Sequence, residues 1–212
     1  MIIPLDRYNP EAAVGPLVRH LRRRGAAVIP TETQYALAAD ATSAEAVERV
    51  RQIKGRGPGA PFTIFLTGVD ELARWRIGCP PAARTLAAAF WPGPLTLILP
   101  TVNPTFKLLG GDGRSVGVRV SPEPLIARLL ARLGHPLLAT SANPSGILLN
   151  PRAENRWLVQ QAQARRLVWA RPTRYRRRAA STIVDCTGSR PRQLRPGPVT
   201  QQAWNDAMRR AV

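Results

Sequence analysis

The sequence predicts an α/β fold in which helices flank a twisted, mixed β-sheet. Short apolar runs of strand-forming residues recur along the whole chain, and stretches with apolar residues at helical spacing separate many of them. Strand and helix alternate, although not strictly, which is typical of a sheet with both parallel and antiparallel neighbours. Because 212 residues of ordinary composition can form one sizeable core, we expect a single domain over residues 1–212.

The first predicted helix ends in a basic turn. Apolar residues between Val14 and Leu21 fall at helical spacing, and three arginines followed by Gly25 supply the last turn and a C-cap. The apolar run 26–30 is a predicted strand, and we expect a polar loop over residues 31–41. Thr42 and Glu45 then have capping-box spacing for a helix that reaches about residue 53.

Further strands and helices follow along the chain. The predicted strands are residues 62–66, 95–99, 115–120, 136–140, 166–170 and 181–185. The predicted helices are residues 80–90, 124–133 and 152–164. The arginine-rich segment 170–180 is predicted to be a mobile, solvated loop.

The charge balance is strongly basic. Lys+Arg 31 against Asp+Glu 13 gives a net charge of +18, and Lys54 and Lys107 are the only lysines. Such an excess attracts polyanions such as RNA, DNA or nucleotides, and this attraction weakens with salt. A compositional bias toward Arg, Ala and Pro gives the same numbers, so charge alone identifies no nucleic-acid partner.

Several common classes of site are not favoured. Cys79 and Cys186 belong to no C-x-x-C pair, which argues against a zinc site and a disulfide framework. His20 and His135 have no second metal ligand at suitable spacing, and we expect no protein-held metal. P-loop and dinucleotide fingerprints are absent. The start lacks a basic segment followed by a long apolar one, and no run approaches a membrane span, so we expect a cytoplasmic protein without a membrane partner.

Small polar side chains stand at the edges of several predicted strands. In "PLLATSANPSG", Thr140, Ser141 and Asn143 end an apolar run, Thr31 to Thr33 follow another, and Ser181 opens the strand 181–185. One interpretation is a simple turn, because Asn-Pro and Ser-Gly are turn dipeptides. The other is the floor of a pocket, since ligands of open α/β sheets bind beyond the carboxyl ends of strands.

Four cationic residues are candidates for an anion site. Lys54 and Arg56 close a helix and enter a Gly/Pro-rich loop, where they could meet an anion or be solvated helix-end charges. Arg119 leaves its strand on the face opposite Val118, and Arg195 precedes a Pro-Gly turn that can orient it. Either arginine could also be an ordinary surface charge.

Six motifs occur in the order seen in the YrdC-like proteins, the threonylcarbamoyl-AMP synthases. They are "PTETQYALAADA", "KGR", "WPGPLTLILP", "VGVRVSPEP", "LLATSANPSG" and "STIVDCTG", the last followed by "LRPG". The resemblance covers roughly residues 10–200 and is closest to the short, single-domain form. The "YALA" and "FTI" segments also resemble the YciO-like branch of the same fold.

The resemblance implies an enzyme, a nucleotidyltransferase for tRNA modification. Such enzymes join L-threonine, bicarbonate and ATP into threonylcarbamoyl-AMP and release pyrophosphate. A partner transferase then passes the threonylcarbamoyl group to tRNA. ATP is a substrate, and Mg²⁺ is expected on its phosphates. Binding of tRNA or double-stranded RNA is a further expectation.

The resemblance also implies roles for individual residues. The implied catalytic and ATP-binding residues are Lys54, Arg56, Ser141 and Asn143, with Arg195 on the nucleotide side. The implied substrate-binding residues around threonine are Thr31, Thr33, Tyr35, Phe65, Arg119 and Ser181. The implied reaction needs its substrates positioned against each other and cations near the phosphates, more than it needs a histidine nucleophile.

The chain departs from the family pattern at four positions. Ala36 and Ala38 replace two glycines, which requires this segment to avoid positive φ. Ala60 and Phe65 stand where the family has a polar residue and a histidine that reaches threonine. Two alternatives therefore stay open: a carbamoyl-adenylate enzyme with another amine or carbamoyl donor, and a YrdC-fold protein that binds RNA without catalysis.

Overall fold

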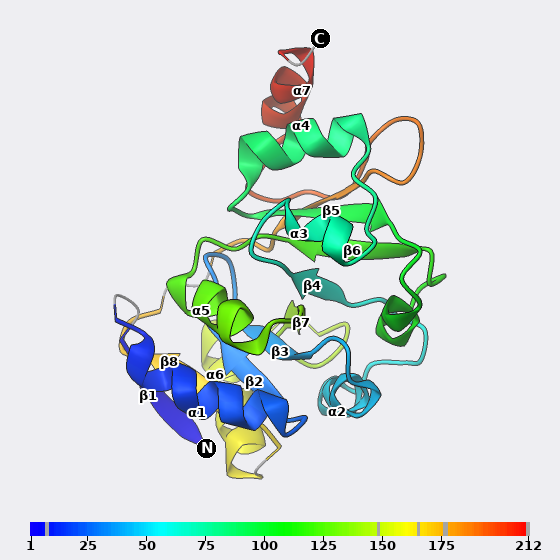
Figure 1. Cartoon of the computed structure of the whole chain (residues 1–212). Coiled ribbons are helices and arrows are strands. Elements are labelled where there is room, and N and C mark those ends of the chain that lie inside the picture. The colour runs from blue at the N-terminus through cyan, green and yellow to red at the C-terminus, as the bar shows by residue number, and fades with distance from the viewer. Residues whose placement is uncertain (7–8, 148, 165, 176–177, 211–212) are drawn as a thin grey trace.

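The computed structural model describes residues 1–6, 9–147, 149–164, 166–175 and 178–210, and within them ten strands form one mixed sheet (Figure 1). The strands are β1 (Ile2–Leu5), β2 (Ala27–Ile29), β3 (Ala36–Asp40), β4 (Thr63–Phe65), β5 (Leu95–Pro100), β6 (Ser115–Arg119), β7 (Leu137–Ser141), β8 (Val168–Pro172), β9 (Thr182–Asp185) and β10 (Arg192–Arg195). Their order in the sheet is β1-β8-β2-β3-β7-β4-β6-β5-β9-β10. The sheet contains parallel pairs such as β4–β6 and β5–β9 and antiparallel pairs such as β3–β7 and β5–β6, which confirms the predicted mixed sheet.

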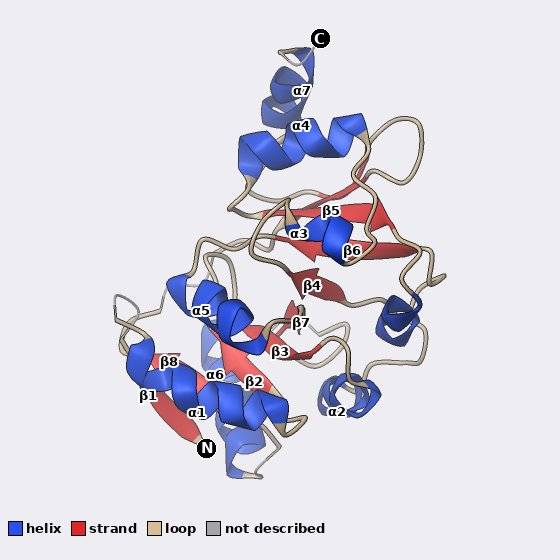
Figure 2. Ribbon diagram, in the orientation of Figure 1, coloured by secondary structure: helices blue, strands red, loops and turns tan. Residues whose placement is uncertain are grey.

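Helices flank this sheet, as predicted (Figure 2). They are α1 (Glu11–Arg22), α2 (Ala44–Lys54), α3 (Glu71–Arg74), α4 (Pro81–Phe90), the 3₁₀ helix η1 (Pro104–Leu109), α5 (Pro124–Leu133), α6 (Pro151–Gln163) and α7 (Gln201–Arg209). None of these described helices has both the length and the apolar character that crossing a lipid bilayer requires.

One face of the sheet is covered along its length. Alternate strand residues such as Leu37, Ile64, Val118 and Leu97 point to this face. They pack against buried side chains of α2, α4, α6, η1 and α7, of which Trp204 belongs to α7. The two-residue period of the strands thus gives the apolar residues one shared core.

The other face is covered over only part of its width. Helices α1 and α5 pack against each other and against β2, β3, β7 and β8, through residues that include Leu17 and Leu129. Figure 1 shows these two helices side by side over one end of the sheet. The same face of β4, β5, β6 and β9 presents side chains such as Thr63, Thr96 and Arg119 to a cavity instead. This incomplete helical cover creates the space for a site.

The segment 31–41, predicted to be a loop, is partly a strand. Residues 36–40 form β3, which pairs antiparallel with both β2 and β7. Its three alanines have low strand propensity, so tertiary burial rather than local preference determines this element. Ala36 and Ala38 take extended backbone there, which explains why the chain tolerates alanine at both positions.

The cap of α2 lies one residue later than predicted. Ser43, not Thr42, is the N-cap, and its hydroxyl accepts a hydrogen bond from Ala46 N (3.3 Å). Thr42 Oγ1 donates to Asp40 Oδ1 instead (2.6 Å). In the segment 170–180, predicted to be a loop, residues 170–172 belong to β8, and residues 176 and 177 lie outside the described residues.

Candidate active site

A cavity of about 860 Å³ lies on the open part of the sheet. This volume falls in the range of small-molecule sites, which is about 300–1,000 Å³. The implied site residues that line it are Thr31, Thr33, Tyr35, Arg56, Phe65, Arg119, Ser141, Asn143, Ser181 and Arg195. Segments far apart in the sequence therefore converge on one space, which favours the pocket-floor interpretation of the hydroxyl clusters.

Arg119 is held at the centre of a polar network. Its side chain is 9% exposed and forms an ion pair with Glu32. The same Nη2 donates to Thr33 Oγ1 (2.8 Å), and Ser121 Oγ donates to the second carboxylate oxygen of Glu32 (2.7 Å). Arg119 Nε is buried and has no hydrogen-bond partner among the described residues. The guanidinium is thus fixed in direction and still has donor capacity for a ligand.

Phe65 lies directly beside Arg119. The two residues are register partners on the parallel strands β4 and β6, and the guanidinium carbon lies 5.7 Å from the centre of the ring. Phe65 is 1% exposed and packs with the α1 and α5 side of the core, whereas Ile64 points to the opposite face. The two-residue period of the strand therefore places Phe65 on the cavity side of the sheet.

Arg195 and Ser181 form a second fixed pair. Arg195 Nε and Nη2 both donate to Ser181 O (3.0 and 2.8 Å), and Nη2 also donates to Ser181 Oγ (3.0 Å). The hydroxyls of Ser181 and Thr96 share a hydrogen bond of 2.9 Å. Burial, with a smaller contribution from Arg119, lowers the pKa of Arg195. Arg119 and Arg195 thus line the same cavity, which favours an anionic ligand there.

Arg56 lines another wall. Its Nη2 donates to Pro61 O (2.7 Å), and Nη1 donates to Thr140 Oγ1 (3.4 Å) at the end of β7. Burial, followed by the charge of Arg51, lowers the pKa of Arg56. Its Nε is buried and unpartnered within the described part of the chain. Arg56 is therefore a cation without a carboxylate partner in the described structure, which favours an anionic ligand.

Lys54 is the implied site residue that is not among the described lining of the cavity. It is 3% exposed, and its Nζ donates to Ser141 O (2.6 Å) and Asn143 O (2.7 Å). Burial, with a smaller contribution from Arg56, lowers the pKa of Lys54 to about 7. The lysine and Arg56, only two residues apart, thus occupy different positions relative to the cavity.

A glycine-rich loop that sequence reasoning missed completes the cavity. Gly110, Gly111 and Asp112 all line it. Gly110 has φ +87°, and a Cβ there would lie 2.7 Å from Ala60 O. Gly111 N donates to Gly59 O (2.7 Å). The run "GGDG" was the available signal, because successive glycines permit such close backbone contact.

Other lining residues also escaped sequence reasoning. Thr96 points away from Leu95 and Leu97, as the strand period requires, so its polar side chain within an apolar strand was a usable signal. Asp112 and Asp185 line the cavity, but no group of three or more potential metal ligands occurs among the described residues. The donor set therefore fits a cation that is held mainly by a ligand's phosphates.

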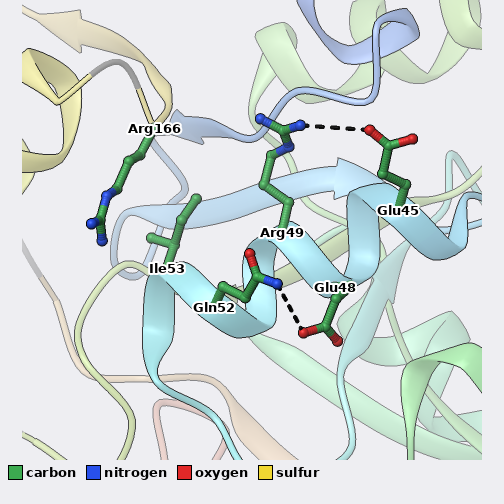
Figure 3. Close-up of a pocket in the computed structure, with 6 residues that line it drawn as sticks. All are labelled: Glu45, Glu48, Arg49, Gln52, Ile53 and Arg166. Atoms are coloured by element: carbon green, nitrogen blue, oxygen red, sulfur yellow. Dashed lines mark hydrogen bonds and ion pairs between the residues drawn. The ribbon is translucent and has the colours of Figure 1, made fainter.

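A second hollow, of about 500 Å³, lies on the outer side of α2. Figure 3 shows that polar side chains of its lining contact one another: Arg49 pairs with Glu45 (3.6 Å), and Gln52 Nε2 donates to Glu48 (3.3 Å). Arg166 is the further cation in its lining. None of the implied site residues lines this hollow within the described structure, so it is not a competing active-site candidate.

Comparison with known proteins gives matches over most of the chain. The Sua5/YciO/YrdC family model, described as "Telomere recombination", matches residues 19–197. A relative from Bacillus subtilis strain 168, "Threonylcarbamoyl-AMP synthase", is 32% identical over 183 residues, which are 86% of this chain and 52% of the relative. The chain thus spans about half the length of that relative.

Two solved structures share the fold. P. abyssi Sua5 complexed with L-threonine superposes with a TM-score of 0.86 at 27% identity, covering 98% of this chain and 61% of that one. E. coli YciO superposes with a TM-score of 0.78 at 25% identity, covering 93% and 96%. Together with the family model over residues 19–197, these likenesses show that the chain belongs to the Sua5/YciO/YrdC family.

Proposed function

We propose that this chain joins L-threonine, bicarbonate and ATP into threonylcarbamoyl-AMP and releases pyrophosphate. The observation that carries this proposal is a single cavity that combines Arg56, Arg119 and Arg195 with small hydroxyl side chains. The substrates bring a triphosphate and a carboxylate, which are the anions that arginines bind best. The name of the B. subtilis relative and the threonine complex of P. abyssi Sua5 support the same reaction.

The chemistry requires positioning and cations. The amine of threonine attacks the carbon of bicarbonate, water leaves, and a carbamate results. A carbamate oxygen then attacks the α-phosphorus of ATP. The bond between the α-phosphorus and the oxygen that bridges to the β-phosphate breaks, and pyrophosphate departs with the electron pair. Cations stabilise the charge that develops on the phosphates, so neither step needs a histidine nucleophile.

Each arginine takes one part of the substrates in this proposal. Arg56 binds the phosphates, since it lines the cavity next to the end of β7 and has no carboxylate partner in the described structure. Arg119 binds the threonine carboxylate, with Thr33 and Ser181 nearby. Arg195 lies on the nucleotide side. Thr31 and Tyr35 complete the amino-acid wall, and Ser141 and Asn143 line the nucleotide and acyl region.

Mg²⁺ and a tRNA pathway belong to the same proposal. The ion would be held by ATP phosphates, with Asp112 and Asp185 as the carboxylates available at the cavity. When bound, such an ion would supply positive charge next to the phosphates. The product then goes to a transferase that modifies tRNA.

A substrate screen tests the proposal. Purified protein with ATP, Mg²⁺ and bicarbonate is offered each common amino acid, and pyrophosphate release and the acyl-AMP mass are measured. We expect a product with threonine, and Arg56→Ala should lose about 2–4 kcal/mol of transition-state stabilisation while remaining folded. Absence of any acyl-AMP, or full activity of Arg56→Ala, would contradict the assignment.

A second candidate is the same reaction with another amine. Phe65 favours it, because a fully buried ring beside Arg119 offers no hydrogen bond to a threonine hydroxyl. The same screen separates the two candidates, since an apolar amine would then give faster pyrophosphate release than threonine.

A further inference from the structure

Lys54 and the strand end at residues 141–145 are joined by three hydrogen bonds. The ammonium donates to Ser141 O (2.6 Å) and Asn143 O (2.7 Å), and Ser145 N donates to Lys54 O (2.8 Å). Distances this short are typical of charge-assisted bonds, which are about twice as strong as neutral ones. The last residue of α2 is therefore tied to the segment that begins the polar motif after β7.

The same segment is held from its other side. Ala142 N donates to Tyr35 O (2.9 Å). Because Ser141 O and Ala142 N belong to one peptide unit, that unit is clamped between Lys54 and Tyr35. The Asn143–Pro144 peptide has no N–H. Its carbonyl oxygen accepts from Lys54, but no hydrogen bond can hold this peptide from its nitrogen side. Lys54 thus fixes the Ser141–Ala142 and Asn143–Pro144 peptides. Asn143 N, on the peptide between them, donates to Ser141 O (3.0 Å).

The side chain of Asn143 shows what this clamp positions. Its Nδ2 donates to Pro144 O (3.0 Å) and Ile147 O (2.6 Å), and because both partners are carbonyls, the orientation of the amide is determined. Its Oδ1 is then left buried without a hydrogen-bond partner among the described residues, while Asn143 itself lines the cavity. A buried acceptor of this kind is costly unless a ligand donor reaches it.

We propose that Lys54 is a positioning residue: from behind the cavity wall, its ammonium fixes the backbone at Ser141 and Asn143 so that Asn143 Oδ1 accepts a hydrogen bond from the substrate. The inference deepens the proposed function and rests on it for the identity of that substrate. Lys54 then acts on the chemical step through Asn143, whereas Arg56, which does line the cavity, binds phosphate directly.

Two methionine variants separate these roles. Lys54→Met keeps the length of the side chain and removes its donors, and Arg56→Met makes the same change in a residue that lines the cavity. For Lys54→Met we expect amide exchange in a peptide covering residues 141–147 to accelerate about tenfold or more, because this segment opens locally. Its kcat should fall by about 100-fold, with the KM for ATP within about threefold of the wild type.

For Arg56→Met we expect the reverse pattern. Its KM for ATP should rise by about tenfold or more, with exchange in residues 141–147 unchanged. Lys54→Gln provides a rescue, since its amide has two N–H donors for the two carbonyls. In Lys54→Gln, amide hydrogens of residues 141–147 should exchange more slowly than in Lys54→Met, and part of kcat should be recovered. If Lys54→Met does not fold, exchange in Lys54→Gln relative to wild type takes its place, with acceleration expected there too.

Two results would overturn the inference. One is a Lys54→Met variant that raises the KM for ATP as Arg56→Met does, with wild-type exchange, which would make Lys54 a phosphate ligand. The other is wild-type exchange in residues 141–147 in every Lys54 variant that folds. Hydrogen exchange needs no substrate, so a wild-type protein without ATP-dependent turnover would contradict the proposed function and leave the exchange test of the clamp intact.

Discussion

At the scale of single residues, charged groups in this protein differ mainly in what compensates them. Arg119 has the Glu32 carboxylate, whereas Arg56 has only neutral acceptors among the described residues. Lys54 is 3% exposed and also has neutral acceptors, and burial lowers its pKa to about 7. Ligand binding and pH should therefore affect these groups differently.

The burial of Lys54 predicts a specific pH dependence of stability. The pKa of Lys54 is about 7 in the folded state against an ordinary value of 10.5, so between these values the unfolded chain binds more protons at this position. Stability from this group therefore rises with pH above about 7, and below pH 7 the full cost of burying the charge is present. The difference in unfolding free energy between the wild type and Lys54→Met isolates this effect, because groups that titrate equally in both proteins cancel.

We expect the difference in unfolding free energy, wild type minus Lys54→Met, to rise by up to about 1.4 kcal/mol per pH unit above pH 7. Urea denaturation of both proteins from pH 6 to pH 9 measures it. A difference that stays constant across this range would show that Lys54 keeps its ordinary affinity for a proton.

Phe65 predicts how well threonine is used. An imidazole in its place can hydrogen-bond a hydroxyl or carboxylate, which the ring beside Arg119 cannot. We expect Phe65→His to raise kcat/KM for threonine by about tenfold, or about 1.4 kcal/mol. Calorimetric titration with threonine, together with turnover, checks this, with Phe65→Leu as the apolar control. Tight threonine binding by the wild type that the histidine does not improve would make Phe65 a packing residue.

At the scale of elements, the turn after β10 packs closely against the backbone of residues 180–182, which includes Ser181, the partner of Arg195. A Cβ on Gly197 would lie 2.4 Å from Thr182 N and 2.6 Å from Ala180 O, which are backbone atoms that cannot move aside cheaply. Gly188 is a matched control in the same region, because the nearest atom to its Cβ would be Arg190 O at 4.0 Å.

We expect Gly197→Ala to lower the unfolding free energy by about 1–3 kcal/mol through overpacking. It should also weaken ATP binding, since the turn and Ser181 together position the guanidinium of Arg195. Gly188→Ala should change stability by less than about 0.5 kcal/mol. Equal unfolding midpoints for the two variants in a denaturant titration would contradict this account.

Elements with strong local signals could be predicted from the sequence, and those set by tertiary contacts could not. The helix from residue 124 to 133 and the apolar strands β4, β5, β6 and β9 follow from periodicity alone. By contrast, β3 depends on pairing with β2 and β7, and β10 pairs with β9 across a register shift. No local pattern indicates which strands will be neighbours, so the strand order remained open.

The same distinction between local patterns and tertiary contacts applies to the candidate site. Hydroxyls at strand ends and the alternation around Arg119 indicated residues that do line the cavity, because strand period is a local property. Lys54 could not be placed in this way, since a helix-end lysine faces solvent, ligand or core according to what packs above it. The acceptors that surround its ammonium lie 87 and 89 residues further along the chain.

At the scale of the whole molecule, net charge is the property that acts over the longest distance. The net charge is +18, and even where carboxylates are present the arginines outnumber them, as on α1 and α5, where Arg128 and Arg132 share the single carboxylate of Glu11. In the segment 170–180, arginines stand at 171, 174 and 176–178, of which 176 and 177 lie outside the described residues. A surface of this kind attracts any polyanion.

We expect RNA binding to be non-specific and to weaken linearly with the logarithm of salt concentration. Neutralising Arg176 to Arg178 with glutamine should reduce the slope by roughly 0.7–0.9 for each phosphate that the variant no longer neutralises. Fluorescence anisotropy with a labelled RNA across a salt series measures both slopes. Equal affinity at low and high salt would exclude the electrostatic account.

The strand order also leaves two edges, β1 and β10, in the described sheet. Edge strands offer unpaired backbone groups through which copies of a protein can aggregate. The net charge of +18 repels a second copy from both edges, but the β1 edge is apolar, with Ile2 41% exposed. Pro4, which has no N–H to donate, interrupts the β1 edge as a template. Resistance of this protein to aggregation therefore depends on mutual repulsion and on one proline, so concentrated salt, which screens that repulsion, should bring copies together along β1.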